Sequence, residues 1–418
     1  MSTEMLQAFP SSLKIVMLGP FAWAPKGTVS ARAFFAAQAL VEQGHRVTIL
    51  MPPYDNPADS GLAWERDGVR LVNARLRGGD SAWNRLAVPL GLARRAVRLA
   101  PDVIHAFKPI SYAGLSSLYL RTFWRSIPLV LDTDDWDGPG GWADVYGRPR
   151  LWKWFFAWLE RWLARRADAV TVASRTLHDQ VRGFGVPAER IFYLPNGPDP
   201  KLRPHPSAGS HPPRQAGQRV RAELGVGDAP LAIYVGHISY GSDLDLLIQA
   251  LPDVVEAVPG VRLIVVGTGD GLPALQAQVQ RAGLAGRVIF TGWVAPHQVG
   301  PYLAAADVAV APYRDTLINR AKCSAKIIYY MAMGKPIVSS RVGQNLEYLD
   351  EGRAGLLSEP GDAQDLAAGI IALLRDPARA AELGRWAGQR IWEHFDWRKQ
   401  VTQIESAYRI ALDRQRSS

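Results

Sequence analysis

The feature that most constrains this chain is an alternation of strands and helices that occurs twice along the sequence. In the first half, an apolar run at residues 13–18 is followed by a glycine-containing loop, an amphipathic helix over residues 30–43 and a second run at 46–50. A strand, a helix and a strand in this order predict parallel pairing. Further apolar runs predict buried strands at 102–106, 127–131, 169–173 and 191–194.

The same pattern begins again after residue 218. Strands are predicted at residues 231–236, 261–266, 287–290, 308–311 and 336–339, with helices between them. A chain of 418 residues is also too long for one ordinary core, which stops growing at about 250 to 300 residues. We therefore predict an α/β fold of two tandem Rossmann-like, doubly wound domains at residues 1–200 and 219–391, separated by a Pro-rich linker or insertion at 201–218.

Composition excludes several classes of protein. No run of eighteen or more uncharged apolar residues occurs, and the N-terminus lacks the pattern of a signal peptide, so we expect a cytoplasmic protein. Cys323 is the single cysteine, which excludes an intrachain disulfide. The net charge of +9 fits anionic lipid headgroups, phosphorylated substrates or merely a basic composition. No recognisable nucleic-acid module is present, so we expect no nucleic-acid partner.

An acidic stretch, L-D-T-D-D-W-D-G-P-G-G-W-A at residues 131–143, follows the predicted strand 127–131. Asp132, Asp134 and Asp135 are expected at the carboxyl edge of the first sheet, where doubly wound domains bind their ligands. The D-x-D spacing alone leaves a metal site and a metal-free role both open.

In the order and spacing of its motifs, the chain resembles family 4 of the retaining, nucleotide-sugar-dependent glycosyltransferases, which have the GT-B fold. The motifs are Gly44-His45-Arg46-Val47-Thr48, Asp102-Val103-Ile104-His105, Ala167-Asp168-Ala169-Val170, Pro195-Asn196-Gly197, Tyr234-Val235-Gly236, Ala306-Asp307-Val308 and Met331-Ala332-Met333-Gly334-Lys335-Pro336. The resemblance implies two domains facing across a cleft, with the acceptor on the first domain and the donor on the second. It also implies C-terminal helices at 392–418 that cross back to the first domain.

The chain departs from this family where the donor is expected to bind. An Arg and a Lys usually follow the first strand of the second domain, but His237 and Ser242 stand there. A pair of glutamates corresponds to Ala321 and Tyr329. A phenol cannot accept hydrogen bonds bidentately as a carboxylate does. Loss of the carboxylate would weaken nucleotide binding by about 1 to 3 kcal/mol unless another group replaces it.

Cations close to the next helix are candidates to replace the missing pair. Arg314, Arg320, Lys322 and Lys326 crowd the loop and the helix start, where the amides around Ser324 add positive potential; the alternative is that they are solvated loop charges. We further assign Gly236, Gly267 and Gly269 to the donor site. Trp293 corresponds to a segment that meets the nucleobase, or is a core residue.

On the acceptor side, the resemblance singles out a loop and two further positions. Lys26, Gly27, Thr28 and Arg32 could grip a phosphate or carboxylate, although Arg32 could also be an ordinary residue at a helix start. His105 is a proton shuttle or, as we favour, a satisfied edge residue. The family's His-Asp pair corresponds to Asp134 and Asp135, so Asp134 is expected to contact the sugar without a metal, Asp135 to anchor the loop, and Asp137 to matter much less.

The helix predicted over residues 151–166 carries aromatic side chains on most of its circumference. Packing in the core and contact with a membrane interface are both open for it, with core packing favoured.

These features predict a metal- and cofactor-independent hexosyltransferase. It would move a sugar from a nucleotide-diphosphate sugar to a glycan or lipid-linked acceptor with retention, in the cytoplasm or at the cytoplasmic face of a membrane. The alternative, favoured by His237, Ser242 and Tyr329, is a catalytically degenerate protein of the same fold that binds a glycan, a lipid or a partner protein.

Overall fold

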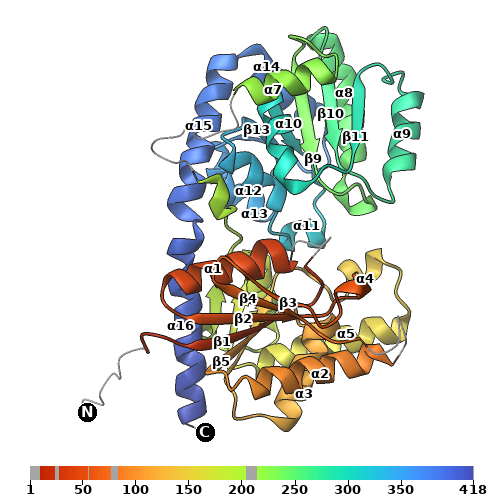
Figure 1. Cartoon of the computed structure of the whole chain (residues 1–418). Coiled ribbons are helices and arrows are strands. Elements are labelled where there is room, and N and C mark those ends of the chain that lie inside the picture. Colours follow the sequence, from red (N-terminus) through yellow and green to blue (C-terminus); the bar gives the residue numbers. More distant parts are fainter. Residues whose placement is uncertain (1–9, 24–27, 55, 77–82, 204–213, 418) are drawn as a thin grey trace. The chain divides into compact units, whose positions relative to one another are not determined.

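Two α/β units, each with its own sheet, make up the protein (Figure 1). The structure is a computed structural model that describes residues 10–23, 28–54, 56–76, 83–203 and 214–417. Unit 1 comprises residues 1–195 and 397–418, and unit 2 comprises residues 196–396. The predicted fold class is therefore confirmed. The C-terminal segment that joins unit 1 begins at residue 397 and not at 392 as expected, because the helix that contains residues 392–394 belongs to unit 2.

Unit 1 is built on an eight-stranded sheet in the order β3-β4-β2-β1-β5-β6-β7-β8, parallel except for β3 with β4. Its strands are β1 (Lys14–Leu18), β2 (Arg46–Met51), β3 (Ala63–Arg66), β4 (Val69–Asn73), β5 (Val103–Phe107), β6 (Leu129–Thr133), β7 (Ala169–Val172) and β8 (Ile191–Tyr193). Every residue of β5, β6 and β7 is buried, as expected of parallel strands covered on both faces.

Helices cover this sheet. They are α1 (Phe34–Glu42), α2 (Asn84–Arg98), α3 (Ser111–Phe123), α4 (Trp142–Val145), α5 (Arg150–Arg166), α6 (Arg175–Gly183) and α16 (Trp397–Arg416). The last of these packs against α1 and against β5 to β8, so the end of the chain is part of the unit 1 core. The helix predicted at residues 30–43 is instead two elements, because Thr28–Ala33 forms a π-helical segment, η1, before α1.

Unit 2 contains a six-stranded, fully parallel sheet in the order β11-β10-β9-β12-β13-β14. The strands are β9 (Leu231–Val235), β10 (Arg262–Val266), β11 (Val288–Gly292), β12 (Val308–Ala311), β13 (Ile337–Ser340) and β14 (Leu356–Ser358). Its helices are α7 (Arg214–Glu223), α8 (Leu244–Ala257), α9 (Leu272–Arg281), α10 (Val299–Ala305), α11 (Leu317–Ala321), α12 (Ala325–Ala332), α13 (Gln344–Tyr348), α14 (Ala363–Arg375) and α15 (Pro377–His394).

The segment predicted as a linker is helical in its last part. Residues 214–218 belong to α7, whose Arg221 binds Ala305 O at 2.8 Å and Asp307 at 2.9 Å. The linker prediction is therefore wrong for these five positions, and residues 204–213 lie outside the described part of the chain.

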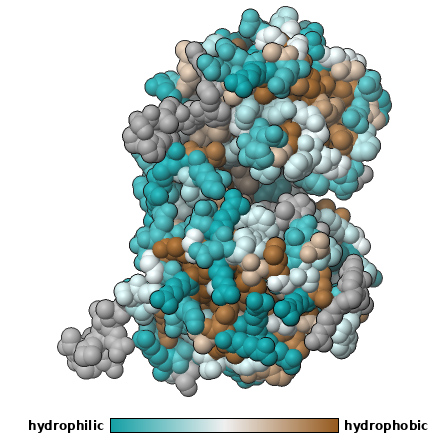
Figure 2. All heavy atoms as spheres, viewed as in Figure 1, coloured by the Kyte–Doolittle hydropathy of each residue, from teal (hydrophilic) through white to brown (hydrophobic). Residues whose placement is uncertain are grey.

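The helix α5 has one buried and one exposed side. Leu159, Leu163 and Ala164 are buried in unit 1, where α5 packs against α3, so core packing is confirmed for this side. On the other side Leu151, Trp154 and Trp158 are exposed at helical spacing. Figure 2 shows other apolar residues interspersed among hydrophilic ones on one face of the molecule. No helix in the described ranges is long and apolar enough to cross a membrane.

Candidate functional site

A buried lysine surrounded by carboxylates lies at the carboxyl edge of the unit 1 sheet. Lys108 directly follows β5 with φ at 68°, in the left-handed region that side-chain-bearing residues seldom adopt. Its Nζ lies 2.5 Å from Asp135 Oδ2, 3.3 Å from Asp134 Oδ1 and 3.9 Å from Asp137 Oδ2. Asp134 and Asp135 are thus brought together as neighbours of one cation. Sequence reasoning missed Lys108, and it expected Asp137 to matter much less than Asp134, whereas the structure places both carboxylates near the same cation.

Burial and mutual charge tune the protonation of this cluster. Burial alone would lower the pKa of Lys108, but the three aspartates outweigh it and hold that pKa well above its usual value. Burial raises the pKa of Asp134 to about 6 and that of Asp137 to about 7, although Lys108 opposes both shifts. It raises the pKa of Glu160, on α5, to about 8. The cluster therefore holds carboxyl groups that exchange protons near neutral pH beside a permanent cation.

Arg32 and Asp132 form a buried ion pair behind this cluster. Arg32 Nε and Nη2 donate to the two oxygens of Asp132 at 2.8 and 2.6 Å, and Nη2 also donates to Leu194 O at 3.0 Å. Thr171 Oγ1 donates to the same carboxylate at 2.6 Å. Asp132 belongs to β6 and is fully buried, which corrects the expectation that it follows the strand. With its guanidinium held in this way, Arg32 fits a structural role better than the predicted grip on an anion.

His105 is a buried, satisfied residue in the middle of β5. Its Nδ1 lies 3.0 Å from Tyr408 Oη and its Nε2 lies 3.2 Å from Thr171 Oγ1. Burial lowers the pKa of His105 to about 4, so the imidazole is neutral. The residue has hydrogen-bond partners on both ring nitrogens, as favoured above over a proton shuttle, but it lies inside the strand and not at the edge. Thr28 begins η1, whereas Lys26 and Gly27 lie outside the described residues.

In unit 2, the three glycines assigned to the donor site lie where the loops after β9 and β10 touch. A Cβ on Gly267 would lie 2.0 Å from Gly236 O, and one on Gly269 would lie 2.1 Å from Ile238 O. Gly236 and Gly267 also have positive φ values of 150° and 141°. Only glycine permits these close backbone contacts at the end of β9.

Lys326, in the first turn of α12, extends to the end of β9. Its Nζ donates to Tyr234 Oη at 2.9 Å and lies 4.4 Å from the centroid of that ring. Its Cε is 3.3 Å from the point that a Cβ on Gly236 would occupy. Within the described ranges no carboxylate forms an ion pair with Lys326. At the N-cap position of the same helix, Ser324 Oγ lies 2.7 Å from Tyr313 Oη.

The two substituted positions after β9 carry no strong cation. The His237 side chain is 69% exposed, with Nε2 3.7 Å from Asp270 Oδ1. Ser242 is buried, and its Oγ donates to Ser239 O at 2.7 Å. Lys326 therefore places an ammonium next to the end of β9, where the family that the chain resembles has an Arg and a Lys.

The other candidate cations differ in how they are neutralised. Arg314 binds Asp243 and Asp245 at 3.0 and 2.6 Å. Arg320, which is exposed, binds Asp315 at 2.5 Å, so the solvated-charge alternative fits it. Lys322 Nζ donates to Asn319 Oδ1 at 3.1 Å and lies 5.4 Å from the Tyr313 ring.

The two aromatic donor-site candidates lie at different depths. Trp293 is 69% exposed, so the alternative that it is a core residue is wrong. Tyr329 is half-buried, and burial raises its pKa to about 12, which keeps the phenol protonated. It can therefore donate as well as accept one hydrogen bond.

Family models match both units of the chain. Residues 27–197 match a model described as a glycosyl transferase 4-like domain, and residues 229–376 match glycosyl transferases group 1. The chain is 27% identical over 407 residues to a glycogen synthase of Mycobacterium tuberculosis, covering 92% of this chain and 91% of the relative.

A second relative is the GDP-mannose-dependent alpha-(1-6)-phosphatidylinositol monomannoside mannosyltransferase of Mycolicibacterium smegmatis. The two are 29% identical over 241 residues, which cover 57% of this chain. The match spans 61% of the relative, which is less than two thirds of its length.

Solved structures share the two-domain GT-B architecture. Sucrose-phosphate synthase from Thermosynechococcus elongatus matches with a TM-score of 0.73 and 22% identity, covering 96% of this chain and 98% of the other. Anabaena HepE in complex with UDP and glucose matches with a TM-score of 0.69 and 21% identity, covering 94% and 98%. The fold and the two family models together show that the chain belongs to the glycosyltransferases.

Proposed function

We propose that this glycosyltransferase moves a hexosyl group from a nucleotide-diphosphate sugar to a glycan or lipid-linked acceptor. The observation that carries the proposal is Lys326, an ammonium without an ion pair in the described ranges, held beside the glycine contact at the end of β9. A departing nucleoside diphosphate gains negative charge, which a fixed cation and the amides at the start of α12 would stabilise.

Names of relatives support a nucleotide-sugar donor without selecting one. One relative is described as GDP-mannose-dependent, whereas a similar structure holds UDP and glucose. One acts on a phosphatidylinositol mannoside and another is a glycogen synthase, so both acceptor classes stay in the proposal. The alternative of a catalytically degenerate binding protein is favoured by His237, Ser242 and Tyr329. Lys326 supplies a fixed cation near the strand end where His237 and Ser242 replace the expected Arg and Lys.

We place the chain in family 4 and infer retention and independence of a metal. The motifs of the sequence support the family. In a retaining mechanism of this type the leaving phosphate itself takes the acceptor proton, so the protein mainly positions the substrates and stabilises charge. In unit 1, Lys108 already gives the acidic cluster a cation, so Asp134 can hydrogen-bond sugar hydroxyls without a bound metal.

Turnover of nucleotide sugars tests this function. The full chain is incubated with UDP-, GDP- and ADP-hexoses and candidate glycan or lipid acceptors, and release of nucleoside diphosphate is measured with and without EDTA. We expect one donor to be consumed at the same rate in EDTA, with NMR showing the anomeric configuration of the donor preserved in the product. Loss of turnover in EDTA would contradict metal independence, and an inverted product would contradict retention.

Peripheral contact with a membrane is part of the same proposal. The exposed side chains of Leu151, Trp154 and Trp158 on α5 form an apolar stripe. The exposed, positively charged Arg161 and Arg165 follow on the same helix at helical spacing. Trp and Arg side chains together suit the interface between lipid and water. Co-sedimentation with lipid vesicles tests this contact.

A further inference from the structure

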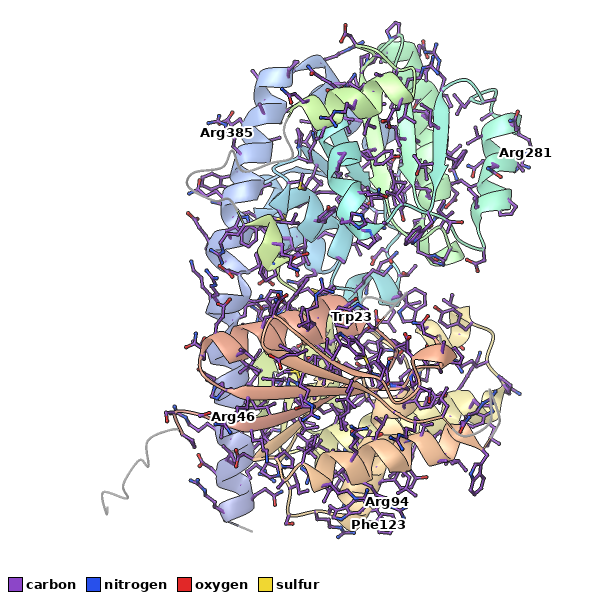
Figure 3. All side chains as sticks on the ribbon, viewed as in Figure 1. Trp23, Arg46, Arg94, Phe123, Arg281 and Arg385 are labelled. Carbon is purple, nitrogen blue, oxygen red and sulfur yellow. The ribbon has the colours of Figure 1, made fainter. Side chains whose placement is uncertain are left out.

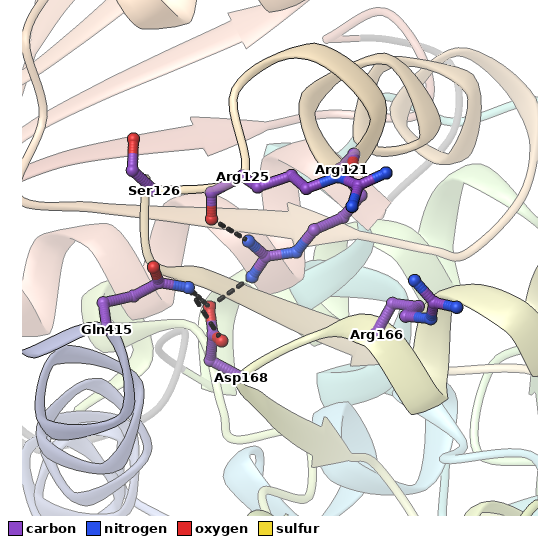
Figure 4. Close-up of a pocket in the computed structure, with 6 residues that line it drawn as sticks. All are labelled: Arg121, Arg125, Ser126, Arg166, Asp168 and Gln415. Atoms are coloured by element: carbon purple, nitrogen blue, oxygen red, sulfur yellow. Dashed lines mark hydrogen bonds and ion pairs between the residues drawn. The ribbon is translucent and has the colours of Figure 1, made fainter. Parts of the chain in front are cut away.

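A basic pocket lies at the amino edge of the unit 1 sheet, away from the carboxylates around Lys108. It has a volume of about 420 Å³ and is lined by Arg121, Arg125, Ser126, Arg166, Asp168 and Gln415 (Figure 4). Ser126 precedes β6 and Asp168 precedes β7, whereas Lys108 and Asp134 follow their strands. A parallel strand of five residues is roughly 16 Å long, so the pocket and the Lys108 cluster lie at opposite edges of the sheet.

The one carboxylate in this pocket is saturated. Asp168 forms an ion pair with Arg121, accepts from Leu129 N at 2.8 Å and accepts from Gln415 Nε2 at 3.1 Å. Figure 4 shows the Asp168 carboxylate between Arg121 and Gln415. Asp168 therefore neutralises Arg121 and has little capacity for a second guanidinium.

The two other arginines of the pocket have no such partner. Arg125 Nε donates to Arg121 O at 3.1 Å, and the Arg166 guanidinium lies 5.3 Å from the centroid of the Trp162 ring. Across the described residues, neither forms an ion pair with a carboxylate. Both side chains are exposed and line the same concavity. Two positively charged side chains thus line one space that can admit an anion.

Neighbouring groups add to the positive potential. Burial lowers the pKa of Arg121 and of Arg190, and Arg414 lowers both further by like-charge repulsion, although Asp168 opposes the shifts. A smaller pocket of about 160 Å³, lined by Trp158, Arg161, Trp162, Arg165 and Arg166, shares Arg166 with the first. A bound anion would relieve the repulsion among these guanidinium groups.

We propose that this pocket is a second binding site, which holds a phosphate group through Arg125 and Arg166. The planar guanidinium fork matches two phosphate oxygens, and two such groups around one pocket provide the donors that a phosphate monoester or diester requires. The phosphate belongs to a soluble phosphorylated molecule or to an anionic lipid headgroup. This site is separate from the proposed donor site, because it lies wholly in unit 1 and Lys326 lies in unit 2.

The test compares phosphate binding by variants with matched loss of charge. The double variant Arg125→Ala/Arg166→Ala removes both unpaired guanidinium groups. The control, Arg281→Ala/Arg385→Ala, removes two exposed arginines of α9 and α15, which project outward from unit 2 in Figure 3. Circular dichroism and the melting temperature establish that both variants fold. Neither pair belongs to the proposed donor site or to the Lys108 cluster.

Two arms distinguish the sources of the phosphate. In the first, isothermal titration calorimetry follows glycerol 3-phosphate binding to the full chain. In the second, co-sedimentation compares phosphatidylcholine vesicles with and without phosphatidylglycerol. Loss of a charge-assisted hydrogen bond typically weakens binding about tenfold to a hundredfold, so we expect the double variant to lose at least tenfold and the control to match wild type. Weaker glycerol 3-phosphate binding by the double variant identifies a soluble ligand. If only its binding to phosphatidylglycerol vesicles is weaker, the ligand is a lipid.

The proposal is overturned if the double variant binds both probes as the control does, or if wild type binds neither probe. A further variant, Lys326→Ala, keeps the proposal separate from the donor site. We expect Lys326→Ala to lose nucleotide binding and to keep the phosphate binding of unit 1. If glycerol 3-phosphate binding falls in Lys326→Ala and not in the double variant, the phosphate occupies the donor site and the second site does not exist.

Discussion

At the scale of single residues, the cations of the donor site show what sequence can and cannot predict. The sequence identified Lys326 as a candidate cation together with Arg314, Arg320 and Lys322. It could not separate them, because neutralisation depends on which carboxylates fold beside each cation. Asp243 and Asp245 bind Arg314 and Asp315 binds Arg320, whereas Lys326 reaches Tyr234, which is distant in sequence.

Asp134 gives a prediction at this scale. Replacing Asp134 by Asn keeps the shape of the side chain and removes its charge beside Lys108. We expect turnover to fall by about tenfold to a hundredfold, the usual effect of losing hydrogen bonds to a charged group. Steady-state kinetics measures the change, with the exposed Asp179→Asn as control. Unchanged turnover in Asp134→Asn would contradict a role for the cluster.

Asp137 lies in the same cluster, so we expect it to matter more for turnover than the sequence suggested. Its Oδ2 is 3.9 Å from Lys108 Nζ, and burial raises its pKa to about 7. Sequence reasoning assigned little importance to Asp137, because the resemblance covered only the pair at Asp134 and Asp135. Lys108 was missed for a similar reason, since a single lysine after a strand has no sequence signature.

At the scale of secondary structure, strands that are buried on both faces were predicted well. The strands β5 and β6 are mostly apolar, and every residue in them is buried. The antiparallel pair β3 and β4 was missed. The strand β3 reads Ala-Trp-Glu-Arg and is mostly exposed, whereas β4 is mostly buried and its apolar residues were overlooked. Residues 214–218 were misread for a related reason: α7 is polar and is held by the tertiary contacts of Arg221.

The buried Glu160 of α5 makes stability depend on pH. Its pKa is raised from 4.5 to about 8 by burial, so the folded protein holds a proton that the unfolded chain releases between these values. The free energy of unfolding should therefore decrease as the pH rises from 4.5 to about 8. Glu160→Gln removes this contribution, and we expect it to unfold less readily than wild type at the alkaline end, by on the order of a few kcal/mol.

Urea denaturation at several pH values measures this effect. The exposed Glu382→Gln on α15 serves as control and should keep the wild-type dependence. Equal slopes of the free energy of unfolding against pH in wild type and Glu160→Gln would contradict the assignment.

At the scale of the whole molecule, the repeated strand–helix pattern was enough to predict two Rossmann-like units. It placed the start of the second unit near residue 219, whereas the structure divides the chain after Pro195. The return of residues 392–418 to unit 1 was predicted from family resemblance, and in the structure it begins at residue 397. The sequence alone could not predict it, because a terminal amphipathic helix such as α16 carries no local sign of the sheet that it covers.

The central claim is that unit 2 binds a nucleoside diphosphate through Lys326, and calorimetry of the full chain with UDP, GDP and ADP tests it directly. We expect at least one nucleotide to bind saturably. Lys326→Ala should weaken that binding by about tenfold or more, the usual effect of losing a hydrogen bond to a charged group, and the exposed Lys399→Ala should not. The claim is contradicted if none of the three binds at millimolar concentration, or if folded Lys326→Ala binds as tightly as wild type.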